Sequence, residues 1–300
     1  MKKTIILVGV VDKESSTNLA QAKYFELLGY KVIPINYRTI LQQHKSFEYL
    51  FGMLEHAVEV YKPELIFFSK CNGVPSNIIK RCTDKTKTWL WFMDYHHNVT
   101  DEILTHVKYA TFASATSTEV VERFKEVNPN SHWIIEGYDQ DIMYPMDSEK
   151  IYDVVFIGNA TEKRIEQLRK ARDVEIFGDG WPTDLNANPP VYQHEFRKTV
   201  CKSKIVLNLV HGNIFSNRVV DSLACGVPVL SEYCDDLNKK FGTVYTFKDI
   251  SKVNFEMVKL MNTKKSLKTT DVSNYSWKRV LDNVLCISNG CETCKEVYYG

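Results

Sequence analysis

Arg218 and Asp221 are the residues whose types and spacing most directly suggest chemistry. They lie within residues 205–230, which read IVLNLVHGNIFSNRVVDSLACGVPVL. IVLNLV predicts a buried strand and SNRVVDSLA a nine-residue helix, followed by Gly226 and Pro228, the usual order of helix stop signals. Residues three positions apart are neighbours on a helix, and here they share the face that the apolar stripe leaves free.

Two interpretations of this pair remain open. A local surface ion pair would contribute little to stability. Alternatively, the helix begins where a parallel sheet presents its ligand site, and there an arginine can face a diphosphate while an aspartate accepts hydrogen bonds from ribose hydroxyls. The spacing alone does not decide between them.

Parallel sheets bind ligands beyond the carboxyl ends of their strands, so the loops after the strands of the second half matter most. These loops are Gly158-Asn159-Ala160-Thr161, Gly178-Asp179-Gly180-Trp181-Pro182, His211-Gly212-Asn213 and Ser231-Glu232-Tyr233. Glycine after a strand lets a backbone approach a phosphate closely. In the second loop, a turn that needs positive φ explains the glycines equally well.

Two cations follow the first of these loops. Thr161 is placed to cap a helix, and Lys163 and Arg164 stand in that helix's first turn. Cations at a helix N-terminus oppose the helix dipole unless an anion lies nearby. We therefore expect at least one of the two to contact phosphate, the alternative being a solvated basic face.

The elements that position these loops follow an alternating pattern. Continuous apolar strands separated by amphipathic helices of 10–15 residues predict parallel sheets covered on both faces. The pattern breaks at residues 137–150. We expect an α/β protein with two Rossmann-like, doubly wound domains, residues 1–145 and 146–270, and a final segment 271–300.

Composition narrows the class of protein. The 300 residues are 44% hydrophobic and 25% charged with a net charge of +1, so no global charge favours nucleic acid or membranes. No apolar run reaches the ~18 residues of a membrane span, and the apolar start resembles a first strand more than a signal peptide. Cys82, Cys201 and Cys225 fall in apolar segments, where free cysteine acts as a small hydrophobe, so we expect a cytoplasmic protein (host-cell cytoplasm if viral).

Five segments carry a resemblance to a known family. They read EGYDQDIMYP, VVFIGNATEKR, EIFGDGWP, GNIFSNRVVDSLACGVPVLSEY and YSWKRVLDNVL, between residues 131 and 288. In order and separation they resemble GT-B glycosyltransferases of family 4, in particular the spore-maturation (CgeB-like) branch. The resemblance implies that the second domain binds a nucleotide diphospho-sugar, that the first binds the acceptor across a cleft, and that the helix around Trp277 crosses back to the first domain.

The resemblance also implies site residues. Family 4 enzymes carry a Glu-x7-Glu pair, whose second position matches Asp221 and whose first falls on Asn213, which is not acidic. The family's sugar-contacting histidine has candidates in His96 or His97, with Asp94 nearby, although two exposed histidines can equally have no role. The implied catalytic residues are Arg218, Asn213, His96, His97 and Asp94, and the implied donor-binding residues are Gly158, Asn159, Lys163, Arg164, Gly178, Asp179, Gly180, Trp181, His211, Asn213, Ile214, Phe215, Arg218 and Asp221.

We expect metal-independent transfer with no cofactor other than the nucleotide-sugar donor. CDD at 234–236 has the pattern of a helix start rather than of an Asp-x-Asp metal pair. Retention of anomeric configuration is implied by the resemblance only. Cys286, Cys291 and Cys294 lack the second cysteine pair of a structural zinc site, so free thiols are the favoured interpretation.

The acceptor is not identified by the sequence: a glycan, a protein, a small molecule or a modified nucleic acid all remain open. Residues 70–87 hold five basic residues against Asp84, which favours a solvated helix face but would also suit a polyanion. The alternative function is an inactive nucleotide- or carbohydrate-binding module of the same fold. A two-domain sensor like the periplasmic binding proteins is disfavoured by the motifs.

Overall fold

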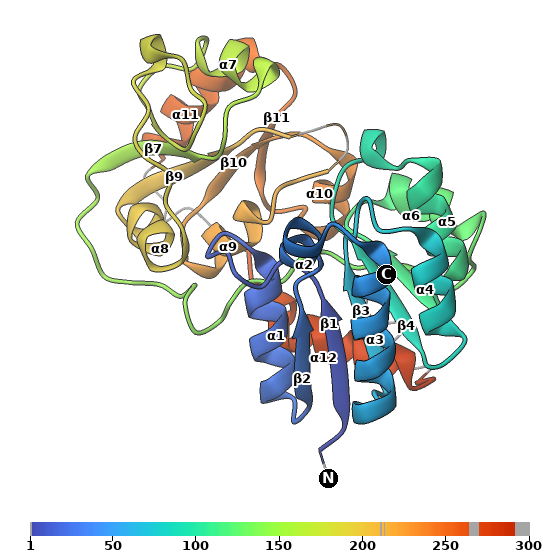
Figure 1. Cartoon of the computed structure of the whole chain (residues 1–300). Coiled ribbons are helices and arrows are strands. Elements are labelled where there is room, and N and C mark those ends of the chain that lie inside the picture. Colours follow the sequence, from blue (N-terminus) through green and yellow to red (C-terminus); the bar gives the residue numbers. More distant parts are fainter. Residues whose placement is uncertain (1, 211, 213, 264–269, 292–300) are drawn as a thin grey trace. The chain divides into compact units, whose positions relative to one another are not determined.

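The computed structural model describes residues 2–210, 212, 214–263 and 270–291, and they form two compact units (Figure 1). The first unit contains the chain up to Gly137 together with the residues from Trp277 onward, and the second runs from Tyr138 to Ser276. The chain therefore leaves the first unit earlier than residue 145 and returns to it later than residue 271.

The first unit is built on six parallel strands in the order β2-β1-β3-β4-β5-β6. They are β1 (Thr4–Val8), β2 (Lys31–Ile35), β3 (Leu65–Ser69), β4 (Thr88–Phe92), β5 (Phe112–Ala115) and β6 (Ser131–Trp133). The helices between them are α1 (Thr17–Leu27), α2 (Tyr37–His44), α3 (Phe47–Tyr61), α4 (Ser76–Thr83), α5 (Asp101–Tyr109) and α6 (Thr118–Lys125). The strand order reverses between β1 and β3.

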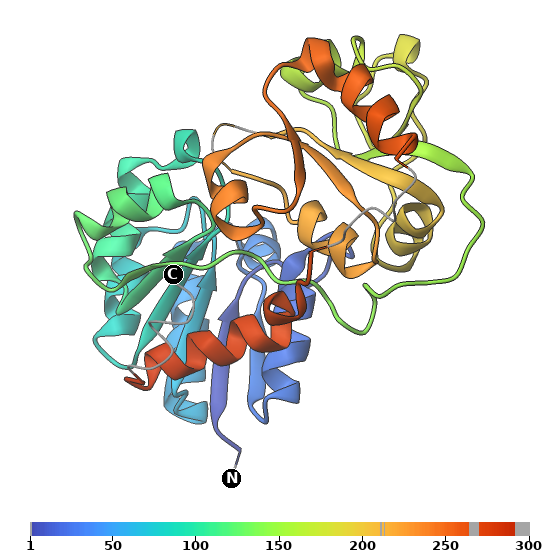
Figure 2. The ribbon, with the colours of Figure 1, turned by 180° about the vertical axis from the view of Figure 1, so that it is seen from behind.

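Helix α12 (Trp277–Ser288) completes one face of this sheet. Figure 2 shows it lying across the strands, and Trp277, Leu281 and Val284 share a buried cluster with the first strand and α1. The opposite face is covered by α2 to α6, whose apolar residues form the other large cluster of the unit. The expected return of the C-terminal helix to the first domain is confirmed.

The second unit is built on five parallel strands in the order β11-β10-β9-β7-β8. They are β7 (Tyr152–Ile157), β8 (Val174–Phe177), β9 (Ser203–Asn208), β10 (Val229–Glu232) and β11 (Tyr245–Phe247). The helices are α7 (Glu162–Leu168), α8 (Gln193–Cys201), α9 (Arg218–Ala224), α10 (Asp235–Lys240) and α11 (Val253–Met261). The chain moves to one side of β7 to form β8 and then to the other side to form β9. The carboxyl ends of β7 and β9 therefore meet at a topological switch point, where such sheets bind ligands.

Local signals in the sequence explain several helix boundaries. The Thr161 side chain accepts a hydrogen bond from the Arg164 N–H, as expected of a cap. CDD at 234–236 is confirmed as a helix start, since α10 begins at Asp235. None of the described helices is both long and apolar enough to cross a membrane.

Candidate functional site

Helix α9 begins at the switch point of the second sheet, and Arg218 is its first residue. The expected nine-residue helix from Ser216 is wrong at its start, because the Ser216 hydroxyl accepts hydrogen bonds from Arg218 Nε at 2.9 Å and from the Arg218 N–H at 3.3 Å. Val219, Val220 and Leu223 are buried, as the apolar stripe predicts. Helix α9 thus presents Arg218 and Asp221 from a face that is only partly buried.

Two guanidinium groups converge on the end of β7. Arg218 Nη1 donates to the carbonyl of Ile157, and Arg164 Nη1 donates to the carbonyl of Asn159 at 3.0 Å. Their Cζ atoms lie 5.8 Å and 5.6 Å from the centroid of the same Phe156 ring. The buried Nε of Arg164 has no hydrogen-bond partner among the described residues.

Burial lowers the pKa of both guanidinium groups. For Arg164 it is the cause of the shift. For Arg218, burial and then the charge of Arg164 lower the pKa to about 9, while the nearby carboxylate of Asp221 opposes the change. Two like charges are thus held together with reduced access to water, an arrangement that a bound anion would relieve.

Gly158 and Gly178 allow this close packing. A Cβ on Gly158 would clash with Arg218 Nη1, and a Cβ on Gly178 would lie 2.6 Å from the carbonyl carbon of Gly158. The Gly158 N–H donates to the Phe177 carbonyl at 2.7 Å, and the Gly178 N–H donates to the Asn188 carbonyl at 3.0 Å. Both N–H groups are therefore engaged within the unit, and the glycines serve chain packing rather than offering free donors to a phosphate.

The remaining residues of the loop 178–182 lie around the carbonyl of Gly158. Trp181 Nε1 donates to the carbonyl of Gly158 at 3.0 Å, and its ring meets Phe156 edge-on at 5.7 Å. Asn159 accepts the N–H of Asp179 at 3.3 Å. Gly180 has φ of 78°, the left-handed region that its turn requires.

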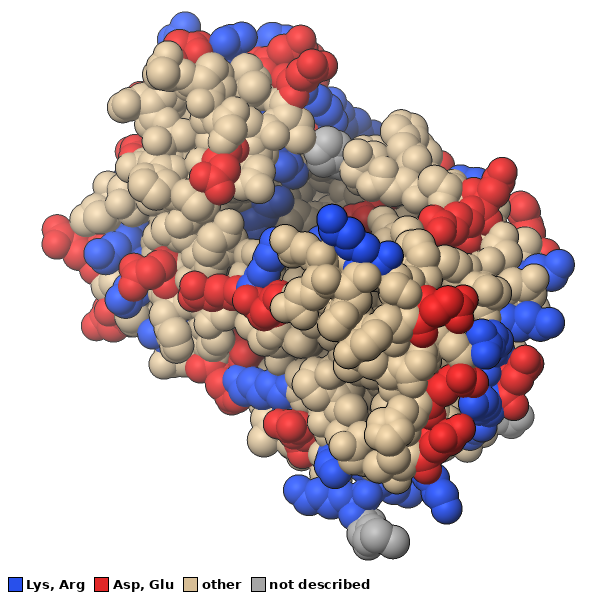
Figure 3. All heavy atoms as spheres, viewed as in Figure 1, with Lys and Arg blue, Asp and Glu red and all other residues tan. Residues whose placement is uncertain are grey.

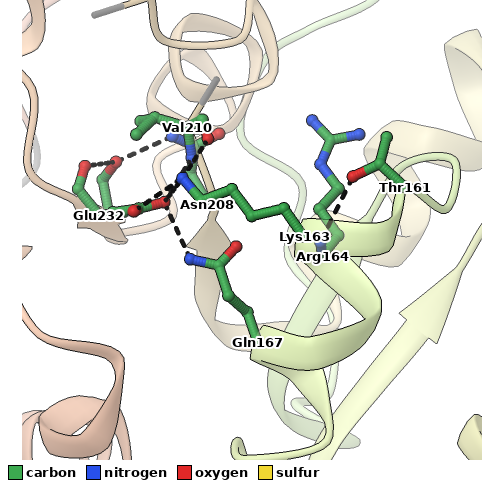
Figure 4. A network of polar contacts seen from close by, with 8 residues as sticks. Thr161, Lys163, Arg164, Gln167, Asn208, Val210 and Glu232 are labelled. Carbon is green, nitrogen blue, oxygen red and sulfur yellow. Dashed lines mark hydrogen bonds and ion pairs between the residues drawn. The ribbon is translucent and has the colours of Figure 1, made fainter. Parts of the chain in front are cut away.

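Lys163 has a different set of partners from Arg164 (Figure 4). Its Nζ lies 2.9 Å and 3.1 Å from the two carboxylate oxygens of Glu232 and 3.0 Å from the carbonyl of Val210. Glu232 also accepts from Gln167 Nε2 at 3.2 Å and from the Val210 N–H at 3.1 Å. Of the two cations expected to contact phosphate, Arg164 is therefore the one whose side chain keeps an unused donor.

The loop between β9 and α9 holds the other expected donor-binding residues. His211 and Asn213 lie outside the described residues. Ile214 is half-buried, and Phe215 is buried against Phe241 with ring centroids 5.7 Å apart. Asp221 accepts a hydrogen bond from Asn217 Nδ2 at 3.2 Å.

In the first unit, three charged residues lie close to one another just after the ends of strands β3, β4 and β6. Lys70, directly after β3, forms an ion pair of 2.8 Å with Asp94, which follows β4. Glu136, after β6, is half-buried in the same environment. Burial raises the pKa of Glu136 to about 7, the charge of Lys70 opposes this, and the charge of Asp94 adds to it. Glu136 belongs to the segment EGYDQDIMYP, but nothing in the sequence of that segment predicts a carboxyl group with a raised pKa.

His96 and His97 form a short 3-10 turn, His96–Asn98. Their ring centroids lie 3.8 Å apart, and His96 Nδ1 is 3.4 Å from a carboxylate oxygen of Glu119. Asp94 is instead engaged by Lys70.

The basic residues of segment 70–87 have partners in their own unit. Lys85 pairs with Glu55 at 2.8 Å, Arg81 stacks over Phe51 at 3.4 Å, and Lys87 donates to the carbonyl of Ser288 at 2.8 Å. Figure 3 shows Lys and Arg interspersed with Asp and Glu over the face in view. These pairings support the interpretation of segment 70–87 as a solvated helix face rather than a binding site for a polyanion.

The cysteines near the C-terminus differ from expectation. Cys286 is disulfide-bonded, so the expectation of a free thiol is wrong for this residue, whereas Cys291 keeps a reduced thiol. Cys294 lies outside the described residues. Within the described ranges, no group of three or more His, Cys, Asp or Glu side chains is placed to hold a metal ion.

Residues 160–283 match the model of a family described as glycosyl transferase-like. The chain is similar to glycosyltransferases. One from Rickettsia africae ESF-5 has a TM-score of 0.72 at 12% identity, over 97% of this chain and 98% of that one. Sucrose-phosphate synthase from Thermosynechococcus elongatus has a TM-score of 0.64 at 10% identity, over 100% and 95%. The UDP-GlcNAc 2-epimerase of Methanocaldococcus jannaschii has a TM-score of 0.57 at 11% identity, over 95% and 99%.

At these identities the structural likeness establishes the fold. The expected class, two parallel-sheet α/β domains of the GT-B type as in glycosyltransferases, is confirmed. No curated protein has a matching sequence.

Proposed function

We propose that the protein is a glycosyltransferase that binds the diphosphate of a nucleotide-sugar donor at the carboxyl ends of β7 and β9. The observation that carries this proposal is the pair Arg164 and Arg218, two half-buried cations against one aromatic ring, with a buried Nε on Arg164 that has no partner among the described residues. A diphosphate supplies the missing negative charge and hydrogen-bond acceptors. Asp221, one turn further along α9, would accept from ribose hydroxyls.

Transfer of the sugar requires that the negative charge that develops on the donor diphosphate is stabilised. As the sugar–phosphate bond breaks, negative charge grows on the departing diphosphate, and fixed guanidinium groups stabilise it. The acceptor hydroxyl would bind at the carboxyl edge of the first sheet, where Lys70, Asp94 and Glu136 gather. We further propose retention of configuration, which the family 4 resemblance supports. The CgeB-like branch stays a proposal on the same motifs, and the sugar, the base and the acceptor are left open.

Asp221→Ala tests the donor site directly. A charged acceptor to a hydroxyl contributes about 1.5–3 kcal/mol, so the dissociation constant for the preferred nucleoside diphosphate should rise about 10- to 150-fold. Isothermal titration calorimetry measures the change. Asp153→Ala is the matched control, because it removes an exposed carboxylate at the amino end of β7, where it pairs with Lys204. Equal affinities in the wild type, Asp221→Ala and Asp153→Ala would mean that Asp221 does not contact the nucleotide.

We also propose that transfer is metal-independent, since Arg164 and Arg218 supply the positive charge that a divalent ion would otherwise provide. Activity should therefore be unchanged in excess EDTA. The measurement is the initial rate with and without EDTA. Loss of activity that Mg²⁺ or Mn²⁺ restores would contradict metal independence while leaving the transferase assignment intact.

An inactive nucleotide-binding module is the second candidate, because Asn213 stands where the family pattern has a carboxylate. A thermal-shift screen with nucleotide sugars identifies the donor, and a ligand at ~100 times its dissociation constant adds about 2.7 kcal/mol. Transfer or slow hydrolysis of a radiolabelled form of that donor supports the enzyme. If the donor binds but is not turned over when acceptors of several classes are added, the result supports the binding module instead.

A further inference from the structure

The pairing between β9 and β10 ends on a side chain instead of on the backbone. Within the ladder, the Val206 N–H donates to the Pro228 carbonyl at 3.0 Å, and parallel pairing repeats such a bond every second residue. On that pattern the Val210 N–H should reach the main-chain carbonyl of Glu232. It donates instead to a carboxylate oxygen of the Glu232 side chain at 3.1 Å, while that carbonyl accepts from the Ser231 hydroxyl at 2.8 Å. The carboxylate therefore takes the place of the backbone acceptor.

Lys163 takes the place of the backbone donor at the same point. In a parallel ladder the carbonyl of Val210 would accept an N–H from the neighbouring strand, and the pattern assigns that N–H to Cys234. Cys234 is instead the cap of α10. The Val210 carbonyl accepts from Lys163 Nζ at 3.0 Å. The ion pair of Lys163 and Glu232 thus replaces one complete rung, a donor and an acceptor, and extends the pairing of β9 to Val210 (Figure 4).

The ion pair is anchored within the second unit. The side chain of Glu232 is 19% exposed and that of Lys163 is 46% exposed, so the carboxylate is fixed in the fold and the ammonium reaches it from the surface. Gln167, one turn after Lys163 on α7, donates to the same carboxylate at 3.2 Å. Hydrogen bonds to charged groups are about twice as strong as those between neutral groups, so these side chains can replace backbone pairing.

The chain passes from this rung to the proposed donor site. Val210 is buried at the end of β9, and the connection that follows it leads to Arg218, the first residue of α9. The far end of the connection is held by Arg218 itself, whose Nε donates to the Ser216 hydroxyl at 2.9 Å. Its near end is held by Glu232 and Lys163. Both ends determine where the guanidinium of Arg218 stands relative to a diphosphate.

We propose that Glu232 is a positioning residue for the donor site and that it acts with Lys163 by holding the end of β9 at Val210. The inference rests on the proposed function, because the role is defined by the placement of Arg218. It assigns Lys163 to the main chain of Val210 and not to the donor phosphates.

Hydrogen–deuterium exchange of the full chain tests the rung without any substrate. In Glu232→Leu the Val210 amide loses its acceptor, so its exchange should become about tenfold faster, as measured on peptides that cover residues 203–210. Glu256→Leu is the matched control, because Glu256 is 25% exposed and pairs with Lys259 at 3.0 Å on α11. It should leave exchange at Val210 unchanged. Equal exchange at Val210 in the wild type and in Glu232→Leu would overturn the proposal.

Kinetics test the consequence for the reaction. Glu232→Leu should lower kcat about 10- to 100-fold and keep the donor dissociation constant within about threefold of the wild type, because Arg218 is displaced and not lost. Glu232→Gln keeps an acceptor oxygen for the Val210 N–H and should recover most of this loss, whereas Glu256→Leu should have the kcat of the wild type. The calorimetric stoichiometry gives the folded fraction of each variant, so partial unfolding is not mistaken for slow turnover.

Lys163→Met separates holding the strand from contacting phosphate. It removes the donor of the rung, so it should lower kcat as Glu232→Leu does, and the double variant should be no slower than either single variant. Donor binding that weakens about tenfold in Lys163→Met alone would mean that Lys163 contacts phosphate, and it would overturn the proposal. A wild-type kcat in Glu232→Leu would overturn it as well. A wild type that binds no nucleotide sugar would overturn the proposed function, and exchange at Val210 would still show whether Glu232 holds the end of β9.

Discussion

Arg218→Ala is expected to lower kcat by about 100- to 1,000-fold while changing the donor dissociation constant much less. Removing one preorganised donor to a developing oxyanion typically has this effect on turnover. The effect falls on kcat because the diphosphate charge grows during bond cleavage and is smaller in the bound ground state. Initial rates at saturating donor, together with calorimetric affinities, measure the two quantities separately.

The structure also gives Arg218 packing roles, since it donates to Ile157 and Ser216. Arg218→Lys keeps the charge without the planar fork and should recover part of the lost rate. Arg169→Ala is the matched control, because Arg169 is an exposed arginine paired with Asp184 at 2.9 Å. If Arg218→Ala and Arg169→Ala have the same kcat with intact folding, Arg218 has no part in the reaction.

Glu136→Gln is expected to stabilise the folded protein at pH 8 and to leave its stability unchanged near pH 4.5. Burial raises the pKa of Glu136 to about 7. A carboxyl group whose pKa is higher in the folded state contributes stability below its unfolded pKa and loses it as pH rises through the folded pKa. The wild type therefore loses this contribution between about pH 4.5 and pH 7, whereas the stability of the variant does not change over this range because a glutamine side chain does not titrate.

The expected gain at pH 8 is about 2 kcal/mol, because one pKa unit corresponds to about 1.4 kcal/mol and partial exposure reduces the effect. Denaturant unfolding at a series of pH values measures it. The groups that face Glu136 are Lys70, Asp94 and Thr17, and none of them changes in the variant. Glu122→Gln, at an exposed position paired with Lys125, should show no such pH-dependent difference. The same small difference at every pH for Glu136→Gln would mean that folding leaves the pKa of this carboxyl unchanged.

Much of the fold could be predicted because its signals are local. The continuous apolar runs of TIILV and LIFFS indicate strands buried on both faces, and all five residues of each are buried. Thr161 caps α7 through a hydrogen bond within its own turn. The start of α9 was wrong because Ser216 is recruited by a side chain, Arg218, which the helical period does not report.

The site was less predictable because its contacts join residues far apart in the chain. Lys163 and Arg164 are adjacent in sequence, yet only Lys163 meets Glu232, 69 positions away. Arg218 reaches a carbonyl 61 positions away. The pKa of Glu136 is raised by burial and, to a smaller extent, by the charge of Asp94, which follows another strand. None of these pairings leaves a spacing pattern that a sequence alone can show.

The path of the chain through the two units has a consequence for synthesis. The chain leaves the first unit at Gly137 and re-enters it at Trp277, and these residues touch, because a Cβ on Gly137 would lie 2.8 Å from the Trp277 backbone. The second unit is an insertion, complete before α12 has been made. On the ribosome, the later-synthesised unit can therefore fold first, while the earlier one waits with the apolar surface around Leu7 and Phe25 uncovered until α12 emerges. Nascent chains cut short before residue 277 should depend on chaperones for their N-terminal half.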